Sequence, residues 1–200
     1  MYNTNLDKNE ANYTALSPLS FLQRTAEVYP NHKSIIHGHR TYTWSETYKR
    51  SCQLASALSS SGIGEKDTVS VLAFNTPEIY EAHFAIPMLG AVINTINIRL
   101  DIETISYILE HAETKALITD TELSPTMKEV IKKINKEILI INICDDQALQ
   151  PDGAGEMIGE IEYEKFLNSG NENFEWSLPK DEWESIALNY TSGTTGLPKG

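Results

Sequence analysis

The chain has 200 residues, of which 40% are hydrophobic and 22% are charged, an ordinary balance for a soluble globular protein. A chain of this length can bury one core or form part of a larger one. The formal net charge of −12 argues against a general nucleic-acid binder, because no basic stripe is present to neutralise phosphates.

Nothing in the composition indicates secretion or membrane insertion. The first 18 residues lack the apolar stretch of a signal peptide, and no apolar run approaches membrane-spanning length. The two cysteines, Cys52 and Cys144, do not make a disulfide framework; both lie among apolar residues and are expected to be reduced core thiols. A cytoplasmic protein is therefore expected.

Helical and extended patterns alternate along the chain. Ser17 and Pro18 have the types expected of a helix N-cap and first residue, Gly38 marks the turn of a hairpin over 34–44, and "TWSE" from Thr43 has capping-box spacing. Helices are expected over 17–30, 43–62, 77–91, 102–112 and 125–137, and strands over 68–74, 92–96, 115–119 and 138–143. Such alternation predicts a parallel sheet that is covered by helices.

Beyond residue 144 the pattern loosens. We expect a loop over 145–160, a short helix over 161–170, a second loop over 171–183 and a strand over 184–190. The predicted fold class is α/β, with a mostly parallel sheet flanked by helices.

The last 11 residues, "YTSGTTGLPKG" from Tyr190 to Gly200, combine glycines, hydroxyl side chains and a lysine. Glycines let backbone N–H groups approach a phosphate chain, hydroxyls add hydrogen bonds, and a lysine supplies a mobile charge. The spacing is not that of a Walker A loop, because Pro198 replaces its second glycine. Nor do Gly193 and Gly196 fit Gly-x-Gly-x-x-Gly. A flexible Ser/Thr/Gly turn that only connects two elements would need neither the lysine nor so many hydroxyls.

This motif resembles the signature phosphate loop of the acyl-adenylate-forming (ANL) enzymes, which include acyl-CoA synthetases, peptide-synthetase adenylation domains and luciferases. Segments 42–46, 62–101, 107–120 and 181–200 are similar to the N-terminal region of bacterial and plant short- to medium-chain acyl-CoA synthetases, including the 3-methylmercaptopropionate–CoA ligase type. The resemblance implies that residues 1–200 are the N-terminal portion of an AMP-binding (adenylation) domain, truncated just after its phosphate loop and without the C-terminal domain.

The resemblance also implies AMP-forming acid–thiol ligation. A carboxylate would attack the α-phosphate of Mg-ATP to give an acyl-adenylate and pyrophosphate, and the CoA thiol would then attack the acyl group. Matching the family's motif to this sequence residue by residue makes Lys199 the catalytic candidate. The phosphate-binding candidates are Thr191, Ser192, Gly193, Thr194, Thr195, Gly196 and Lys199. The implied cofactors and substrates are ATP, Mg²⁺, CoA and a small carboxylic acid, with no nucleic acid and no membrane span.

The family's ATP- and Mg²⁺-binding segment, its ribose-binding aspartate and its catalytic C-terminal lysine have no counterpart in these residues. The return strand of the loop is likewise expected beyond Gly200. The chain alone is therefore expected to lack ligase activity. The alternative function is a non-catalytic remnant that binds nucleotide weakly or pairs with a partner chain. Another phosphotransfer enzyme is disfavoured by the Walker spacing.

Other polar residues carry weaker signals. His37 and His39 could suggest a metal pair, but two ligands without a third make an exposed hairpin the better prediction. Asp145 and Asp146 are expected to be solvated in a loop. His111 is expected to be a hydrogen-bonded helix residue rather than a general base. No metal site is predicted.

Overall fold

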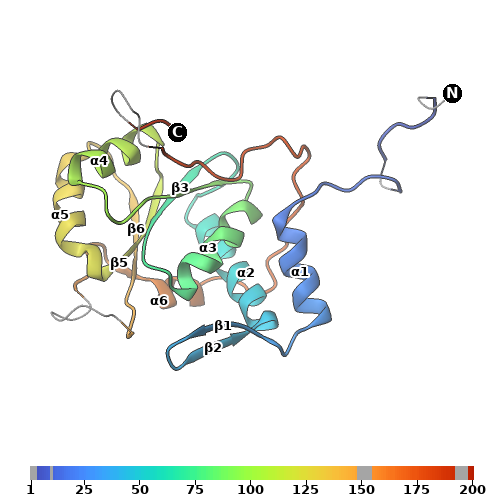
Figure 1. Cartoon of the computed structure of the whole chain (residues 1–200), viewed down its shortest axis with the longest axis horizontal. Helices are drawn as coiled ribbons and strands as arrows, with labels where there is room; N and C mark the ends of the chain where they lie inside the picture. The colour runs from blue at the N-terminus through green and yellow to red at the C-terminus, as the bar shows by residue number, and fades with distance from the viewer. Residues whose placement is uncertain (1–3, 10, 148–154, 192–197) are drawn as a thin grey trace.

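A five-stranded parallel sheet lies at the centre of the computed structural model, which describes residues 4–9, 11–147, 155–191 and 198–200 (Figure 1). The strands, in the order β4-β3-β5-β6-β7, are β3 (Thr68–Leu72), β4 (Val92–Thr95), β5 (Ala116–Asp120), β6 (Leu139–Ile143) and β7 (Ile161–Glu162). Every neighbouring pair in this sheet is parallel. The predicted α/β class with a mostly parallel sheet is confirmed.

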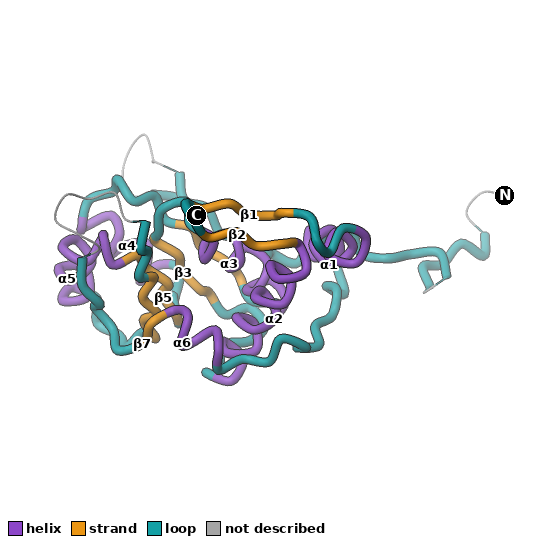
Figure 2. Tube along the Cα trace, turned by 90° about the horizontal axis from the view of Figure 1, so that it is seen from below, coloured by secondary structure: helices purple, strands orange, loops and turns teal. Residues whose placement is uncertain are grey.

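Helices cover both faces of the sheet, as Figure 2 shows. They are α1 (Pro18–Val28), α2 (Trp44–Ser60), α3 (Pro77–Met88), α4 (Ile102–His111), α5 (Ser124–Lys133) and α6 (Tyr163–Asn168), with a 3₁₀ turn η1 (Thr121–Leu123). Helices α4 and α5 pack on one face, α2, α3 and α6 pack on the other, and α1 packs outside α2 and α3. Among the described residues, no helix has the length and apolar character needed to cross a membrane.

Local capping signals set several helix boundaries. Ser17 Oγ accepts a hydrogen bond from the second residue of α1, and Asp101 accepts one from the third residue of α4. Thr43 and Glu46 form the predicted capping box at the start of α2. Pro87 lies one residue before the end of α3, as expected of a residue that interrupts helix hydrogen bonding.

Alternate strand residues divide the hydrophobic core into two clusters. Val69, Val71 and Ile118 belong to the cluster with α2, α3 and α6, whereas Leu72 and Leu117 belong to the cluster with α4 and α5. Successive strand side chains point to opposite faces, so almost continuously apolar strands serve both layers. Each such side chain contributes roughly 1.5–3 kcal/mol of burial free energy.

Extended pairing differs from the prediction in two places. Residues 184–190 are not a strand; among the described residues they pair with β4 only through the parallel bridge between Ala187 and Ile93. Strand β7 was not predicted, because its two residues were assigned to the short helix over 161–170. A pair of residues has no periodicity by which a strand can be identified.

The two cysteines lie in different environments. Cys52 is buried in α2, as predicted, whereas Cys144 is exposed, which corrects the prediction of a core thiol. Cys144 follows the last residue of β6, where the chain leaves the buried sheet. Both are free thiols.

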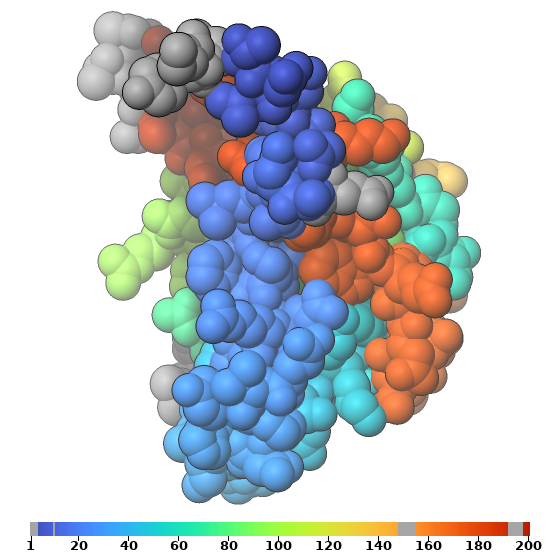
Figure 3. All heavy atoms as spheres, turned by 90° about the vertical axis from the view of Figure 1, so that its right-hand side faces the viewer, coloured from blue at the N-terminus to red at the C-terminus, as the bar shows by residue number. Residues whose placement is uncertain are grey.

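The segment before α1 contacts the loop over 171–183. Tyr13 Oη donates a hydrogen bond to Glu182 Oε1 at 3.2 Å, and the Leu16 N–H donates to the same oxygen at 2.7 Å. Figure 3 shows the N-terminal segment in blue beside the orange residues of this loop. The loop prediction for 171–183 is confirmed, and Trp183 within it is 92% exposed.

A hairpin of β1 (Lys33–His37) and β2 (Arg40–Thr43) is held against the carboxyl ends of the strands by buried ion pairs. Arg40 donates to Glu78 at 2.7 Å and to Asp145 at 2.7 Å, and His37 Nε2 lies 2.8 Å from Asp145. The prediction that Asp145 is solvated is therefore wrong. Asp145 closely follows β6 and meets the hairpin there, while Asp146 is exposed.

Asp120, the last residue of β5, is a further buried carboxyl group beside this cluster. Its Oδ1 accepts the N–H of Glu122 at 2.9 Å, and its Oδ2 has no hydrogen-bond partner among the described residues. Burial raises the pKa of Asp120 to about 6; the nearby carboxylates act in the same direction, and the Glu122 N–H opposes them.

Replacing Asp120 with asparagine is expected to stabilise the fold at pH 8 but not at pH 4. Because the folded-state pKa exceeds the unfolded value of roughly 3.9, the carboxyl group's contribution to stability is lost as the pH rises through 6. The neutral amide avoids this loss, so the free energy of unfolding, measured with urea at pH 8, should be roughly 1–3 kcal/mol higher than that of the parent. Asp101→Asn, at an exposed cap, should show no gain. A less stable Asp120→Asn variant at pH 8 would contradict the argument.

Candidate functional site

The glycine-rich motif begins after an extended stretch that runs beside β4. Ala187 pairs in parallel with Ile93, and Thr95 Oγ1, at the end of β4, donates to Asn189 Oδ1 at 3.4 Å. The chain therefore arrives at Tyr190 along the edge strand of the sheet, near the chain's end marked in Figure 1.

Thr191 and Lys199 form a closed stem. The N–H of Thr191 donates to the carbonyl of Lys199 at 2.9 Å, and the N–H of Lys199 donates back to the carbonyl of Thr191 at 3.1 Å. The return strand was expected beyond Gly200, but its antiparallel pairing already begins at Lys199. The other predicted phosphate-binding residues lie outside the described part of the chain: Ser192, Gly193, Thr194, Thr195 and Gly196.

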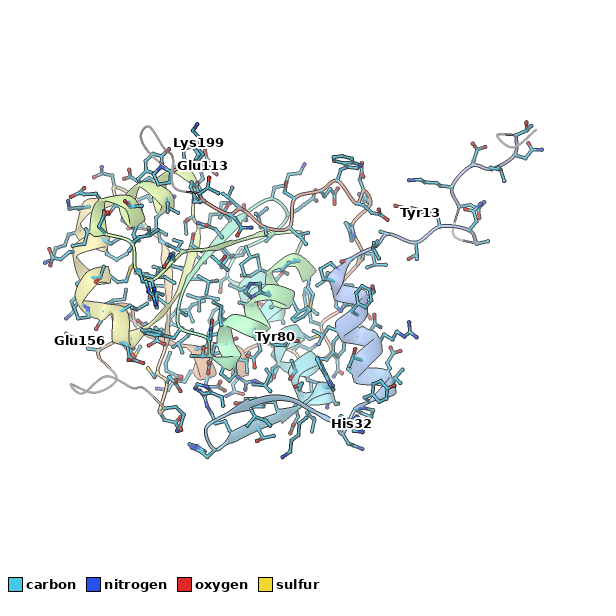
Figure 4. All side chains as sticks on the ribbon, viewed as in Figure 1. Tyr13, His32, Tyr80, Glu113, Glu156 and Lys199 are labelled. Carbon is cyan, nitrogen blue, oxygen red and sulfur yellow. The ribbon has the colours of Figure 1, made fainter. Side chains whose placement is uncertain are left out.

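At the two described stem residues, Thr191 and Lys199, the side chains take no part in the backbone pairing. The backbone N–H groups of Thr191 and Lys199 are used within the stem. Thr191 Oγ1 lies 3.5 Å from the Lys199 carbonyl, which is too long for a strong hydrogen bond, so this hydroxyl can donate elsewhere. The Lys199 side chain is exposed and lies at the outer edge of the molecule in Figure 4. A hydroxyl donor and a mobile ammonium group suit the oxygens of a polyphosphate.

A pocket with a volume of about 400 Å³ adjoins the stem. Its walls come from the end of β4, from the loop that leads to α4, from α4 itself and from both arms of the stem; they include Thr95, Asn97, Thr104, Thr191 and Pro198. A concave site of this size with a few polar groups among apolar ones is typical of small-molecule binding.

Tyr190 is anchored to α4 immediately before the stem. Tyr190 Oη and His111 Nδ1 are joined by a hydrogen bond of 2.7 Å, and the two rings meet edge to face with their centroids 5.7 Å apart. His111 is thus hydrogen-bonded, as predicted. Burial raises the pKa of Tyr190 above the ordinary value of a phenol. The partners are 79 residues apart, and no local pattern in the sequence indicates their contact.

The two hairpin histidines contact separate carboxylates. His37 bonds Asp145, whereas His39 Nε2 lies 3.2 Å from Asp146. In the part of the chain that the structure describes, no group of three or more His, Cys, Asp or Glu side chains could hold a metal ion.

Comparisons with known proteins find similarity along most of the chain. The family model described as AMP-binding enzyme matches residues 22–200. An acetate–CoA ligase from Humulus lupulus is 48% identical over 98% of this chain, and a peroxisomal acetate/butyrate–CoA ligase from Arabidopsis thaliana is 45% identical over 98%. A peroxisomal trans-cinnamate:CoA ligase from Petunia hybrida is 42% identical over 98%. The chain spans only 36% of the length of each of these curated relatives.

Solved structures of CoA ligases share the fold. The anthranilate–CoA ligase AuaEII, in complex with anthranoyl-AMP, matches with a TM-score of 0.78 and 23% identity over 96% of this chain and 35% of its own. A fatty acyl-CoA synthetase from Mycobacterium tuberculosis matches with a TM-score of 0.70 and 22% identity over 91% of this chain and 33% of its own. At these identities, the likeness shows the fold alone.

Proposed function

Because this chain belongs to the AMP-binding enzyme family, we propose that it is the N-terminal portion of an ATP-dependent acid–CoA ligase. The observation that carries the proposal is the closed stem of "YTSGTTGLPKG", which brings Thr191 and Lys199 together beside a pocket of about 400 Å³. The curated relatives, whose names are those of acetate–, butyrate– and cinnamate–CoA ligases, support the same class of reaction.

In the proposed reaction, a carboxylate oxygen attacks the α-phosphorus of ATP, and the bond to the β-phosphate oxygen breaks. An acyl-adenylate and pyrophosphate result; the CoA thiolate then attacks the acyl carbon, and AMP leaves. Negative charge grows on the departing pyrophosphate, where the Lys199 ammonium group can offset it. The Thr191 hydroxyl donates to a phosphate oxygen. Further donors are proposed from Ser192, Gly193, Thr194, Thr195 and Gly196, since the N–H groups of the stem are already paired.

The remaining substrates are a small carboxylic acid and CoA. ATP would enter with Mg²⁺ as part of the substrate, and the described residues include no metal-binding cluster to which a step could be assigned. The cytoplasm is the proposed location, although two of the relatives are named as peroxisomal.

The 200-residue chain by itself is expected to show no carboxylate-dependent release of pyrophosphate, whereas the complete ligase should show it. The 200 residues span only 36% of the length of the relatives that are named as CoA ligases. The measurement is pyrophosphate release from ATP with acetate, butyrate and cinnamate, compared with no added acid. Release by the purified 200-residue chain would contradict the expected inactivity. No release by the complete protein with any acid of a wider panel would contradict the ligase proposal and favour the non-catalytic alternative.

A further inference from the structure

The ring of Tyr190 connects α4 to both arms of the loop stem. Its hydroxyl group bonds His111 on α4, and the next residue, Thr191, begins the backbone pairing with Lys199. A methyl group built onto Gly200 would lie 2.8 Å from the Tyr190 ring. Real side chains do not tolerate so short a contact, so glycine lets the returning backbone pack directly against this ring.

His111 is itself held in place by a second aromatic ring of the same helix. Tyr107, one helical turn earlier, stacks on His111 with the ring centroids 5.2 Å apart and the planes 30° from parallel. Residues four apart lie on the same helix face, so this stack needs no distortion of α4. The three rings form a continuous series from the helix to the stem, which we name the aromatic brace: Tyr107, His111 and Tyr190.

On the basis of the proposed function, we propose that His111 is a positioning residue for ATP binding, acting through Tyr190 to hold the stem that carries Thr191 and Lys199. The brace fixes where the stem lies relative to α4 and to the adjacent pocket. Ordering a mobile stem when ATP binds would cost free energy and weaken binding. A stem that is already held in place avoids this cost, so ATP binds more tightly. His111 touches no reacting atom in this role.

Loss of the brace should first appear in the stem amides of the 200-residue chain. In His111→Ala and Tyr190→Phe, hydrogen exchange at the N–H groups of Thr191 and Lys199 should accelerate about fivefold to tenfold, as expected when one hydrogen bond of about 1 kcal/mol is lost. His111→Asn places an amide group near the position of Nδ1 and should restore most of the protection. His83→Ala is the matched control, because His83 Nδ1 bonds the Ile79 carbonyl within α3.

The second measurement uses steady-state kinetics of the complete ligase. His111→Ala and Tyr190→Phe should raise KM for MgATP about fivefold to tenfold. The KM for the carboxylic acid should stay within about twofold of the parent value, since the brace acts on the stem alone. A general loss of folding would instead reduce the fraction of active enzyme and lower the apparent kcat, whichever substrate is varied. His111→Asn would not restore that kcat.

Each result decides the proposal. Accelerated exchange at Thr191 and Lys199, together with a selective rise in KM for MgATP, supports it. Unchanged exchange in both His111→Ala and Tyr190→Phe overturns the brace. Accelerated exchange with an unchanged KM for MgATP overturns the positioning role. If the complete protein does not adenylate any acid, the proposed function and the positioning role both fail, while the exchange data still decide separately whether the brace holds the stem.

Discussion

Replacing Lys199 with alanine should slow acyl-adenylate formation in the complete ligase by about a hundredfold to a thousandfold, the effect that removing one donor to a developing negative charge has in other active sites. The pairing of Lys199 in the stem and its proposed role in catalysis use different atoms. Its backbone N–H and carbonyl close the stem with Thr191, whereas its ammonium group is exposed and free to approach a ligand. Alanine removes only the ammonium group and the side chain that carries it, so the stem should stay paired.

The Lys199→Ala prediction is checked by single-turnover formation of acyl-adenylate at saturating ATP. Amide exchange at Thr191 in the 200-residue chain should match the parent, in contrast to His111→Ala. Lys132→Ala removes an exposed lysine on α5, paired with Glu129 at 2.6 Å, and should leave the rate unchanged. Adenylate formation by Lys199→Ala at the parent rate would show that the assigned role of this lysine is wrong.

Much of the fold could be predicted because its signals are local. The capping residues Ser17, Thr43 and Asp101 act within a few positions of themselves, and the apolar strands are recognisable from their own composition. Asp145 shows the limit of prediction from local sequence signals. Its neighbours in the sequence indicate a solvated loop, whereas its environment is set by Arg40 and His37, more than 100 residues away. Long-range partners of that kind leave no periodic pattern in a single sequence.

The candidate site divides in the same way. The glycine-rich motif is contiguous, so its resemblance to the family's phosphate loop could be recognised in the sequence, and that resemblance supplied Thr191 and Lys199 as candidates. The Tyr190–His111 contact joins two segments 79 residues apart, and the sequence shows only two aromatic residues in separate elements. The return strand of the stem was predicted beyond Gly200, whereas the pairing with Thr191 begins at Lys199. A single paired residue that follows a proline has no periodicity by which a strand can be predicted.

Arg50 connects three helices through one buried carboxylate, Glu81, and one half-exposed carboxylate, Glu164. Its loss should cause the largest change in stability. Its guanidinium group donates to Glu81 on α3 at 2.6 and 3.2 Å and to Glu164 on α6 at 3.0 Å. Tyr163 Oη donates to the same Glu81 carboxylate at 2.8 Å. Glu81 is fully buried, and the Arg50 guanidinium also lies 4.7 Å from the Tyr42 ring centroid. Removing one partner of such a pair leaves an uncompensated buried charge.

Arg50→Ala should therefore lower the free energy of unfolding by roughly 3–5 kcal/mol at pH 8.5, where Glu81 of the parent protein is ionised and depends on Arg50. Lys49→Ala is the matched control, because Lys49 also forms an ion pair, with Glu172 at 3.2 Å, but on the exposed surface. That exposed pair should contribute less than about 1 kcal/mol. Urea unfolding of both variants measures the difference. If Arg50→Ala lowers the free energy of unfolding by no more than Lys49→Ala does, the network around Arg50 does not hold α2, α3 and α6 together.

The pH dependence identifies the group that Arg50 compensates. Burial raises the pKa of Glu81 to about 7, and the attraction of Arg50 opposes that rise. Since the folded-state pKa lies above the unfolded value of roughly 4.3, the stability that Glu81 contributes is lost as the pH rises through 7. Without Arg50 the pKa of Glu81 rises further, so the loss continues to a higher pH. The deficit of Arg50→Ala should therefore widen between pH 6 and pH 8.5, whereas a constant deficit would mean that lost packing, not an uncompensated Glu81, causes it.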